Sequence, residues 1–409
     1  MNIGLVGFGV SNRAVYEHFK SVHKIFVHNQ EKIPLPSDAT PVFDRYLECN
    51  EDIVFRSPSV RREKIKTNAP IYCEATYALD KIKGRKICVS GSDGKTTTSS
   101  LIFEILKSKN AYLGGNIGKD LISTIDKNYD FTVAELSSFQ LMDASPRCDY
   151  AILTGITENH LDYHLNMDEY ISAKENLLKN ASHIILNYDC EILRDLGKKY
   201  SNVSYFSLST ECDAYICDGF IMLHGKKLFE VSKIKLRGKY NQLNILASIL
   251  ATEDYATLGE IENAVTSFNG VSHRCELIRE ISGVKFYNSS IDSTPSRTIT
   301  TLNDFEKSRS IVILGGRNKN LSYEILGKEL KGLKCAIILG ENRNEILTAL
   351  NPYVDSIYLV NNLSEAVSLG YKIAKNGDSV ILSPASTSFD MYKSYTERGE
   401  DFKKIVNSL

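Results

Sequence analysis

The chain has 409 residues, and its 49 basic and 50 acidic side chains leave a formal net charge of −1 at pH 7. This balance excludes the overall basic footprint of a nucleic-acid-binding or membrane-surface protein and leaves only a local charged patch open. The hydrophobic content of 43% is typical of a globular protein, and the length predicts about three domains.

The cysteines and the apolar runs bear on the cellular compartment. Nine cysteines are scattered singly without a C-x-x-C pair, which predicts reduced thiols rather than disulfides. The sequence opens in an apparent strand without the pattern of a leader, and no run approaches ~18 apolar residues. We therefore expect a cytoplasmic, monomeric protein with no membrane and no nucleic acid as partner.

The chain begins with the pattern of a strand, a glycine turn and a helix. The apolar run Ile3 to Val6 leads into Gly7-Phe8-Gly9, and helical spacing continues through Phe19. Asn12 at the third glycine position and His28-Asn29 after the second strand argue against NAD, which prefers a glycine and an acidic residue there. A nucleotide pyrophosphate site and a purely structural turn both remain open.

Further strands over residues 52–58 and 71–72 complete a small α/β unit, and Ala78 to Arg85 is the expected linker to the next domain. That domain opens with a second strand, glycine loop and helix. Ile87 to Val89 breaks into a loop containing Gly91 and Gly94, and Lys95-Thr96 starts a helix. Backbone N–H groups of such a loop bind phosphate oxygens, a lysine adds positive charge, and a threonine ligates Mg²⁺. The first glycine comes three residues before Gly94 instead of five, so the motif is a shortened phosphate loop. A solvated turn before a helix is the alternative.

A carboxylate follows in a position suited to a metal ion. Gly114 to Gly118 is expected to be an irregular glycine turn, and Tyr129 to Gln140 contains a buried strand that ends at Glu135. An acidic residue at the carboxyl end of a strand beside a phosphate loop completes a Mg²⁺ shell. A neighbour of a helix N-cap is the alternative role of Glu135.

The third strand of this domain, Tyr150 to Leu153, is followed by His160 and His164. With Asp162 between them these histidines alternate, but no fourth ligand with zinc spacing follows. The position of His160 after a sheet strand favours a functional role. Lys174 lies in a helix that opens at Asp168, and composition alone would make it a solvated lysine.

The rest of the chain predicts two further regions. Short alternating strands follow Asn187, and Asn241 and Asn244 lie one helical turn apart before the apolar helix Ile245 to Ala251, where they are placed to contact a base or to cap the helix. A boundary is expected near Gly270 to Glu276. The strands expected beyond it are Ser310 to Leu314, Cys335 to Leu339, Ser356 to Val360 and Ser379 to Leu382. Their alternation with helices predicts a parallel sheet with helical crossovers.

Taken in order, these motifs resemble the Mur ligases of peptidoglycan synthesis. The segments that carry the resemblance are Ser90 to Thr96, Gly115 to Gly118, Glu135 to Gln140, Thr157 to His160 with Lys174, Gly238 with Asn241 and Asn244, His273-Arg274, and Ser383 to Asp390 running on to Glu397-Arg-Gly399. The resemblance implies an α/β fold of three domains. These are a Rossmann-like domain for a UDP substrate at 1–80, a central phosphate-loop ATPase-type domain at 81–271, and a C-terminal Rossmann-like domain for the amino acid at 272–409.

The resemblance also implies the chemistry. ATP, with two Mg²⁺ ions, would phosphorylate the alanyl carboxylate of UDP-N-acetylmuramoyl-L-alanine, and the amine of D-glutamate would attack the acyl phosphate. Lys95, His160 and Lys174 are the implied catalytic residues, and the family lysine at the position of Lys174 carries a carbamate. The implied nucleotide-binding residues are Gly91, Ser92, Asp93, Gly94, Lys95, Thr96, Thr97, Asn241, Asn244 and Arg274, the metal ligands are Thr96, Glu135, His160 and Lys174, and the substrate-binding residues are Val10, Ser11, Asn116, Ser293, Lys319, Ser388 and Tyr395.

The chain departs from the family pattern at three places. Ser289 stands where many members have an aspartate that contacts ATP, Ile291 where many have a lysine, and His28-Asn29 where an acidic residue lies near the uridine. The alternatives are therefore a ligase of this superfamily that adds another amino acid, a folylpolyglutamate-synthase-like ligase, and a nucleotide-binding protein that has lost catalysis.

Overall fold

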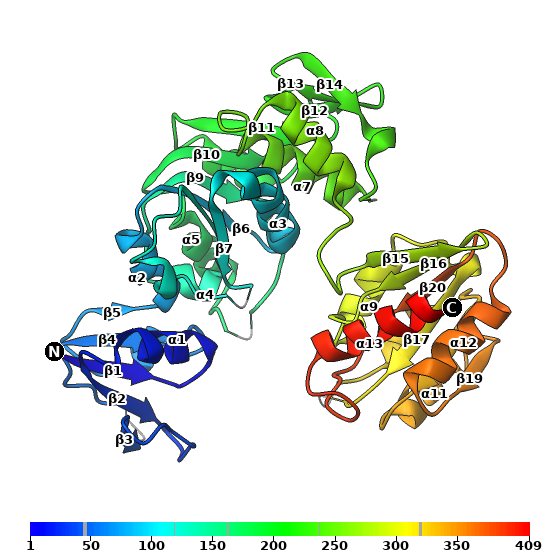
Figure 1. The fold of residues 1–409 in the computed structure, drawn as a ribbon, viewed down its shortest axis with the longest axis horizontal. Helices are drawn as coiled ribbons and strands as arrows, with labels where there is room; N and C mark the ends of the chain where they lie inside the picture. The colour runs from blue at the N-terminus through cyan, green and yellow to red at the C-terminus, as the bar shows by residue number, and fades with distance from the viewer. Residues whose placement is uncertain (44–46, 118, 162, 237, 319–320) are drawn as a thin grey trace. The chain divides into compact units, whose positions relative to one another are not determined.

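The computed structural model describes residues 1–43, 47–117, 119–161, 163–236, 238–318 and 321–409 (Figure 1). The described chain divides into two compact units, Met1–Phe268 and Asn269–Leu409. Two sheets lie in the first unit and one in the second. None of the helices in these ranges is both long enough and apolar enough to cross a membrane.

The N-terminal sheet, drawn in blue in Figure 1, has the order β3-β2-β1-β4-β5, and its strand pairs are all parallel. Its elements are β1 (Asn2–Val6), α1 (Val10–Phe19), β2 (Lys24–Asn29), β3 (Thr40–Phe43), β4 (Ile53–Arg56), β5 (Ile71–Tyr72) and α2 (Glu74–Lys81). The predicted strands and first helix are confirmed. The linker expected from Ala78 is wrong in its first half, because α2 continues to Lys81. Ala78 and Leu79 are fully buried there, so the helix packs one face into the core. The charged residues that follow in the sequence made this segment look like a linker.

The central sheet has the order β14-β13-β12-β11-β10-β9-β6-β8-β7, parallel from β12 to β7 and antiparallel at β13 and β14. Its strands are β6 (Arg85–Ser90), β7 (Ala111–Gly115), β8 (Phe131–Glu135), β9 (Cys148–Leu153), β10 (Ala181–Asn187), β11 (Val203–Ser207), β12 (Ala214–Cys217), β13 (Phe220–Leu223) and β14 (Lys226–Glu230). The helices are α3 (Lys95–Leu106), α4 (Ser138–Leu141), α5 (Met167–Glu175), α6 (Glu191–Gly197), α7 (Lys239–Leu250) and α8 (Leu258–Ser267).

Alternating side chains of the central strands feed two separate cores. In β9, Tyr150 and Ile152 pack into the core under α3 and α7, whereas Ala151 and Leu153 pack into the core under α5 and α6. The second of these cores continues through α2 into the N-terminal sheet, where it includes Leu5 and Phe55. The shared core explains why residues 1–268 form one compact unit.

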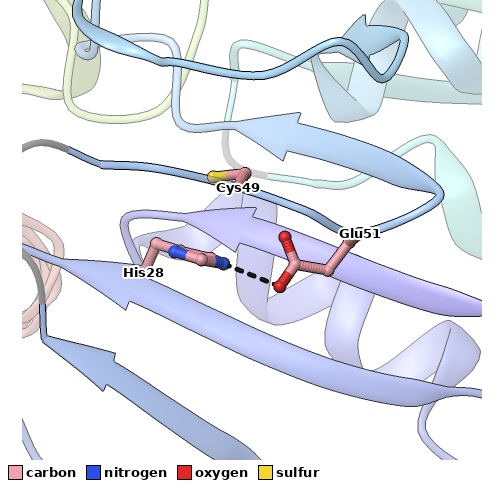
Figure 2. Close-up of side chains that lie close together, drawn as sticks. All are labelled: His28, Cys49 and Glu51. Carbon is pink, nitrogen blue, oxygen red and sulfur yellow. Dashed lines mark hydrogen bonds and ion pairs between the residues drawn. The ribbon is translucent and has the colours of Figure 1, made fainter.

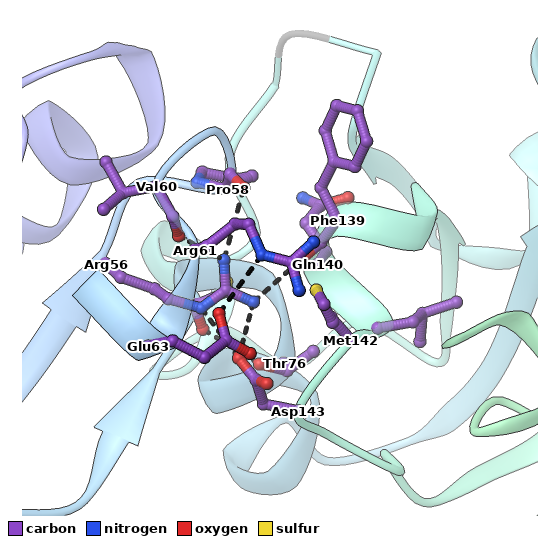
Figure 3. Close-up of polar contacts among 12 residues, drawn as sticks. Arg56, Pro58, Val60, Arg61, Glu63, Thr76, Phe139, Gln140, Met142 and Asp143 are labelled. Atoms are coloured by element: carbon purple, nitrogen blue, oxygen red, sulfur yellow. Dashed lines mark hydrogen bonds and ion pairs between the residues drawn. The ribbon is translucent and has the colours of Figure 1, made fainter. Parts of the chain in front are cut away.

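A buried arginine fastens the two sheets of the first unit to each other. Arg56, at the end of β4, is 1% exposed, and its guanidinium pairs with Asp143 at 2.7 Å (Figure 3). The same guanidinium donates to the carbonyl oxygens of Pro58, Val60 and Phe139 at 3.2, 3.1 and 2.8 Å. Because a buried charge is tolerated only when it is paired and hydrogen-bonded, Arg56 requires the loop after β4 and the α4 segment to stay together.

The second unit is a six-stranded sheet of order β15-β16-β20-β17-β18-β19, covered on both faces. Its elements are β15 (Glu276–Ile281), β16 (Val284–Asn288), α9 (Pro295–Leu302), β17 (Ser310–Gly315), α10 (Glu324–Glu329), β18 (Cys335–Leu339), α11 (Arg343–Leu350), β19 (Ile357–Leu359), α12 (Leu363–Ile373), β20 (Ser379–Leu382) and α13 (Tyr395–Ser408). The predicted alternation of strands and helices is confirmed, with β18 and β20 at the expected residues.

The structure corrects two details of the predicted elements. Gly114 and Gly115 close strand β7, since strand pairing to β8 continues through Gly115, so the predicted turn begins only at Asn116. Gly118 lies outside the described residues. The sheet of the second unit is not wholly parallel, because β15 pairs antiparallel with β16. The turn between them, Ser282-Gly283, has φ of +51° and +76°, the left-handed pair typical of a two-residue hairpin. This Ser-Gly dipeptide was the available signal.

Candidate active site

The phosphate loop has the predicted strand, loop and helix, and its glycines are required by their surroundings. Gly91 and Gly94 have φ of +148° and +80°. A Cβ on Gly91 would lie 2.0 Å from Thr154 Oγ1, and a Cβ on Gly94 would lie 2.3 Å from Asn244 Oδ1. The loop is therefore pressed against the strand end of β9 and against α7, with room only for glycine.

Two lysines donate to the carbonyl groups of this loop. Lys95 Nζ, in the first turn of α3, donates to Gly91 O at 2.9 Å and to Ser92 O at 2.8 Å. Lys174 Nζ donates to the same Gly91 oxygen at 2.7 Å. Lys95 thus adds positive charge at the start of α3, where the helix N-terminus and the loop N–H groups also favour an anion.

Lys174 is buried, contrary to its classification as solvated on composition alone. The residue is 1% exposed, and its ammonium lies 4.8 Å from the centre of the Tyr170 ring. Burial, and then the nearby charge of Lys95, lower the pKa of the Lys174 ammonium well below its usual range, while Asp93 and Glu135 act in the opposite direction. Burial in α5 beside the loop therefore favours the neutral amine.

The remaining loop residues divide between internal contacts and exposure. The hydroxyl of Ser92 lies 2.8 Å from Tyr170 Oη, donates to Thr157 O at 3.1 Å and accepts from Thr157 N at 2.9 Å. It ties the loop to the segment after β9. Asp93 is exposed, and Thr96 is half-buried in the first turn of α3, whereas Thr97 is buried.

Glu135 ends β8 as predicted, and one of its oxygens is left over. The side chain is 2% exposed, and Oε1 accepts from Asn116 Nδ2 at 2.9 Å. Glu135 Oε2 is buried and has no hydrogen-bond partner within the described ranges. A buried carboxylate oxygen with unused lone pairs fits a hard cation such as Mg²⁺. Asn116, expected at the substrate, is in this structure a partner of the carboxylate.

His160 lies on the same side, in the segment after β9. Its backbone is left-handed, with φ of +56°, and its ring centre lies 5.0 Å from that of Phe139 and 6.4 Å from that of Tyr170. Tyr170 thus neighbours His160, Lys174 and the Ser92 hydroxyl at once. Asp162 lies outside the described residues.

The two asparagines of α7 support the loop from behind. Asn244 is 5% exposed, accepts from Thr98 Oγ1 at 3.2 Å and donates to Asn241 Oδ1 at 3.3 Å. Its carbonyl oxygen is the atom that faces Gly94. Asn244 therefore fixes the start of α3, a role that its spacing from Asn241 did not reveal.

Asn12, which stands at the third glycine position of the first motif, holds the N-terminal turn in shape. Asn12 is fully buried, and its amide donates to the carbonyls of Val6, Gly7 and Phe55 at 3.0, 2.9 and 3.1 Å. Val10 is 72% exposed and Ser11 half-buried in the first turn of α1. The turn therefore presents Val10 and Ser11 outward while Asn12 fixes its shape.

In the second unit, the residues with a predicted binding role differ in exposure. Ser388 is buried and Tyr395 is 42% exposed, while Ser293 and Arg274 are half-buried. Lys319 lies outside the described residues.

Arg398, which had no predicted role, is 4% exposed and donates from Nε to Ser290 Oγ at 3.0 Å and from Nη2 to Ser386 O at 3.1 Å. Burial lowers the pKa of its guanidinium to about 10. Ser289, the first departure from the family pattern, is fully buried and accepts from Cys275 N at 3.2 Å.

Comparison with known proteins gives matches along the whole chain. Residues 89–252 match the Mur ligase middle domain, and residues 273–386 match the Mur ligase glutamate ligase domain. The chain is 36% identical to the UDP-N-acetylmuramoylalanine–D-glutamate ligase of Clostridium perfringens strain 13, covering 100% of this chain and 97% of that protein. The enzyme of the same name from Clostridium botulinum strain Okra is also 36% identical, with coverages of 100% and 96%.

Solved structures share the fold at lower sequence identity. The UDP-N-acetylmuramate–alanine ligase MurC of Thermotoga maritima aligns with a TM-score of 0.64 and 21% identity, over 100% of this chain and 99% of that one. The MurF ligase of Thermotoga maritima, solved in complex with ADP, aligns with a TM-score of 0.58 and 18% identity, over 99% and 95%. With relatives matched from end to end at 36% identity and both family domains in place, this chain belongs to the Mur ligase family.

Proposed function

We propose that this protein is an ATP-dependent ligase that joins D-glutamate to UDP-N-acetylmuramoyl-L-alanine in the synthesis of peptidoglycan precursors. The observation that carries the proposal is the full-length similarity to enzymes named for that reaction, together with a glycine loop on which two lysines converge. The reaction uses ATP to phosphorylate the alanyl carboxylate, and the amine of D-glutamate then displaces phosphate to form the amide. The UDP-linked substrate and ATP point to the cytoplasm as its compartment, and we expect a monomer.

The phosphate loop binds the ATP phosphates in this proposal. The N–H groups from Asp93 to Thr97 surround the phosphate oxygens, Gly91 and Ser92 shape the loop, and Lys95 moves from its loop carbonyls to the transferred phosphate. Asn244 and Asn241 hold the start of α3 and contact the nucleotide, as does Arg274. Because the loop is shaped before ATP binds, little ordering is needed at the moment of transfer.

Mg²⁺ fits the residues around the loop. Thr96, Glu135, His160 and Lys174 would hold two ions, and the unpartnered oxygen of Glu135 is the structural observation that supports this set. When bound, Mg²⁺ neutralises the charge on the phosphate oxygens. An ammonium does not ligate a cation, so Lys174 takes part as a carbamate, formed when its neutral amine adds CO₂ and releases a proton.

Each of three regions holds one substrate in this proposal. Residues 1–80 hold the UDP-linked substrate with Val10 and Ser11, residues 81–271 hold ATP and contribute Asn116, and residues 272–409 hold D-glutamate. The D-glutamate carboxylates are bound by Lys319, Ser388 and Tyr395, with Ser293 beside them. Within the described part of this last region, Arg398 keeps Ser386 next to Ser290 and so supports the segment that carries Ser388.

The test is phosphate release from ATP with Mg²⁺ and UDP-N-acetylmuramoyl-L-alanine. D-Glutamate is included, omitted, or replaced by L-glutamate, L-lysine or diaminopimelate. We expect release that requires D-glutamate, with formation of the amide product. Release with another amino acid would assign a different ligase of the superfamily, and ATP binding without release under any condition would favour a protein that has lost catalysis.

A further inference from the structure

A group of three potential metal ligands lies in the N-terminal sheet, apart from the phosphate loop. His28 is at the end of β2, and Cys49 and Glu51 come from the segment that leads into β4 (Figure 2). His28 and Cys49 are each 2% exposed, and the side chain of Glu51 is 8% exposed. One ligand atom from each of the three lies within 4.8 Å of the other two.

The polar atoms of this group are only partly satisfied. His28 Nε2 and Glu51 Oε1 are 3.0 Å apart and form a hydrogen-bonded pair. His28 Nδ1 and Glu51 Oε2 are both buried, and in the part of the chain that the structure describes neither has a hydrogen-bond partner. The alternative to a ligand site is a buried, hydrogen-bonded His–Glu pair beside a small apolar cysteine, and it accounts for the contact between His28 Nε2 and Glu51 Oε1. It does not account for two buried polar atoms without partners, which are uncommon in native proteins.

A bound cation accounts for the convergence of the three side chains, and a carboxylate that ligates through both oxygens would also use Glu51 Oε2. Imidazole nitrogen, thiolate and carboxylate together are the ligands of zinc, whereas Mg²⁺ and Ca²⁺ need several oxygens and this group supplies one carboxylate. Two nitrogen or oxygen ligands of a tetrahedral zinc lie about 3.3 Å apart, close to the spacing of the His28 and Glu51 pair. Cys49 Sγ donates to Leu47 O at 3.6 Å, and metal binding would exchange this weak contact for a zinc–sulfur bond.

We propose that His28, Cys49 and Glu51 form a zinc site that fixes the segment before β4 against β1 and β2. Binding through Nε2 of His28 releases the thiol proton of Cys49 and leaves the ring proton of the neutral imidazole on Nδ1. Three protein ligands leave a fourth position for water.

The site lies beneath the turn assigned to the UDP-linked substrate. The N–H of Gly7 donates to the carbonyl oxygen of His28 at 2.8 Å, so the histidine that ligates zinc also holds the glycine turn. Glu51 lies over β1, because a Cβ added to Gly4 would come within 2.8 Å of Glu51 Oε2. Zinc would therefore stiffen the floor of this turn without contacting the phosphate loop.

Cobalt substitution tests the site directly. The full-length protein is stripped with a chelator and titrated with Co²⁺, whose thiolate complexes give a charge-transfer band in the near ultraviolet and intense visible bands. We expect both in the wild-type protein, and their displacement by one equivalent of Zn²⁺. The proposed Mg²⁺ ligands include no thiol, so Co²⁺ bound there gives no thiolate band.

Variants then identify the sulfur. Cys49→Ser should abolish the thiolate band and weaken Zn²⁺ binding at least about tenfold. Cys73→Ser is the matched control, because Cys73 is also a buried cysteine of the first unit but lies outside the group, and it should keep both the band and the affinity. If Cys49→Ser does not fold, His28→Gln leaves the thiol intact and should lower Zn²⁺ affinity to the same degree. The proposal would be overturned by the absence of a thiolate band in the wild-type protein, by survival of the band in Cys49→Ser, or by unchanged Zn²⁺ affinity in His28→Gln.

Discussion

The first unit contains two strand, glycine turn and helix motifs with the same backbone plan and different surroundings. In both, the helix begins after a glycine, Gly9 before α1 and Gly94 before α3, and within the described ranges neither helix start has a side-chain cap. Behind the first turn lies the neutral amide of Asn12, which donates to three carbonyls. At the second, Lys95 and Lys174 both donate to the carbonyl of Gly91.

The difference shows that the side chain behind a glycine turn, more than the glycines, sets its chemistry. A neutral amide shapes the N-terminal turn without adding charge, which suits a turn that meets one part of a nucleotide-linked substrate. At the second turn Lys95 supplies positive charge, and burial together with that charge lowers the pKa of Lys174. In the proposed function, the same plan serves as a positioning turn in one sheet and as a phosphate site in the other.

Removing Lys174 has the largest expected effect. In Lys174→Ala the proposed metal ligand is lost, and we expect phosphate release to fall by about 10³-fold or more, since metal ions contribute several kcal/mol at such transition states. Steady-state phosphate release measures this. Lys179→Ala is the control, because that lysine is exposed on the same segment and pairs with Asn176. A short carboxylic acid should partly restore turnover in Lys174→Ala, whereas wild-type rates in that variant would refute the ligand role.

The same substitution in the two turns should affect different substrates. In Gly91→Ala the new Cβ meets Thr154 Oγ1 at 2.0 Å, and in Gly7→Ala it meets Ser57 Oγ at 2.8 Å, both at positive φ. Strain of this kind costs about 1–3 kcal/mol, or roughly 5- to 150-fold in apparent affinity. We expect KM for ATP to rise in Gly91→Ala, and KM for the UDP-linked substrate to rise in Gly7→Ala. Equal effects of both variants on both substrates would show that the turns are not separate sites.

Asn12→Ala tests whether the first turn depends on its amide. The substitution removes the amide that donates to the carbonyls of Val6, Gly7 and Phe55, and we expect the free energy of unfolding to fall by about 2 kcal/mol. Urea unfolding measures the change, and ATP binding at the phosphate loop should be retained. A loss well under 1 kcal/mol would mean that water replaces the amide.

The sequence was sufficient where a residue's role is local. The strands β18 and β20 have the limits expected from short apolar runs, because parallel strands buried on both faces have continuous apolar sequences. The phosphate loop and the strand that ends at Glu135 were also predicted from neighbouring residues alone.

Roles that depend on distant partners were missed. Asn12 bonds to Phe55, Arg56 to Asp143 and Phe139, and Asn244 to Thr98, and no short pattern encodes these separations. Lys174 is the clearest case, since its burial depends on packing of α5 against the loop and not on its neighbours in the chain. The resemblance to a family identified Lys174, whereas the residues alone did not.

The smallest expected effect concerns a carboxylate that, like Lys174, is buried with its neutral form favoured. Glu74 Oε1 accepts from the N–H groups of Leu121 and Ile122, each at 2.7 Å. Burial raises the pKa of this carboxyl from 4.5 to about 7, although the two N–H donors act against the rise.

The unfolded chain therefore loses the proton of Glu74 first as the pH rises, so between about pH 4.5 and 7 the folded state holds a proton that the unfolded state has released. Stability contributed by this group falls across that window and stays lower above it. Glu74→Gln keeps a carbonyl acceptor without the charge, so its unfolding free energy relative to wild type should increase between pH 5 and pH 8, by on the order of 1 kcal/mol. Urea unfolding at the two pH values measures this, with Glu31→Gln as an exposed control. A difference that is constant or decreases with pH would show that the folded protein holds Glu74 ionised. Its two N–H donors would then outweigh the effect of burial on its pKa. At Lys174, by contrast, the charge of Lys95 acts in the same direction as burial.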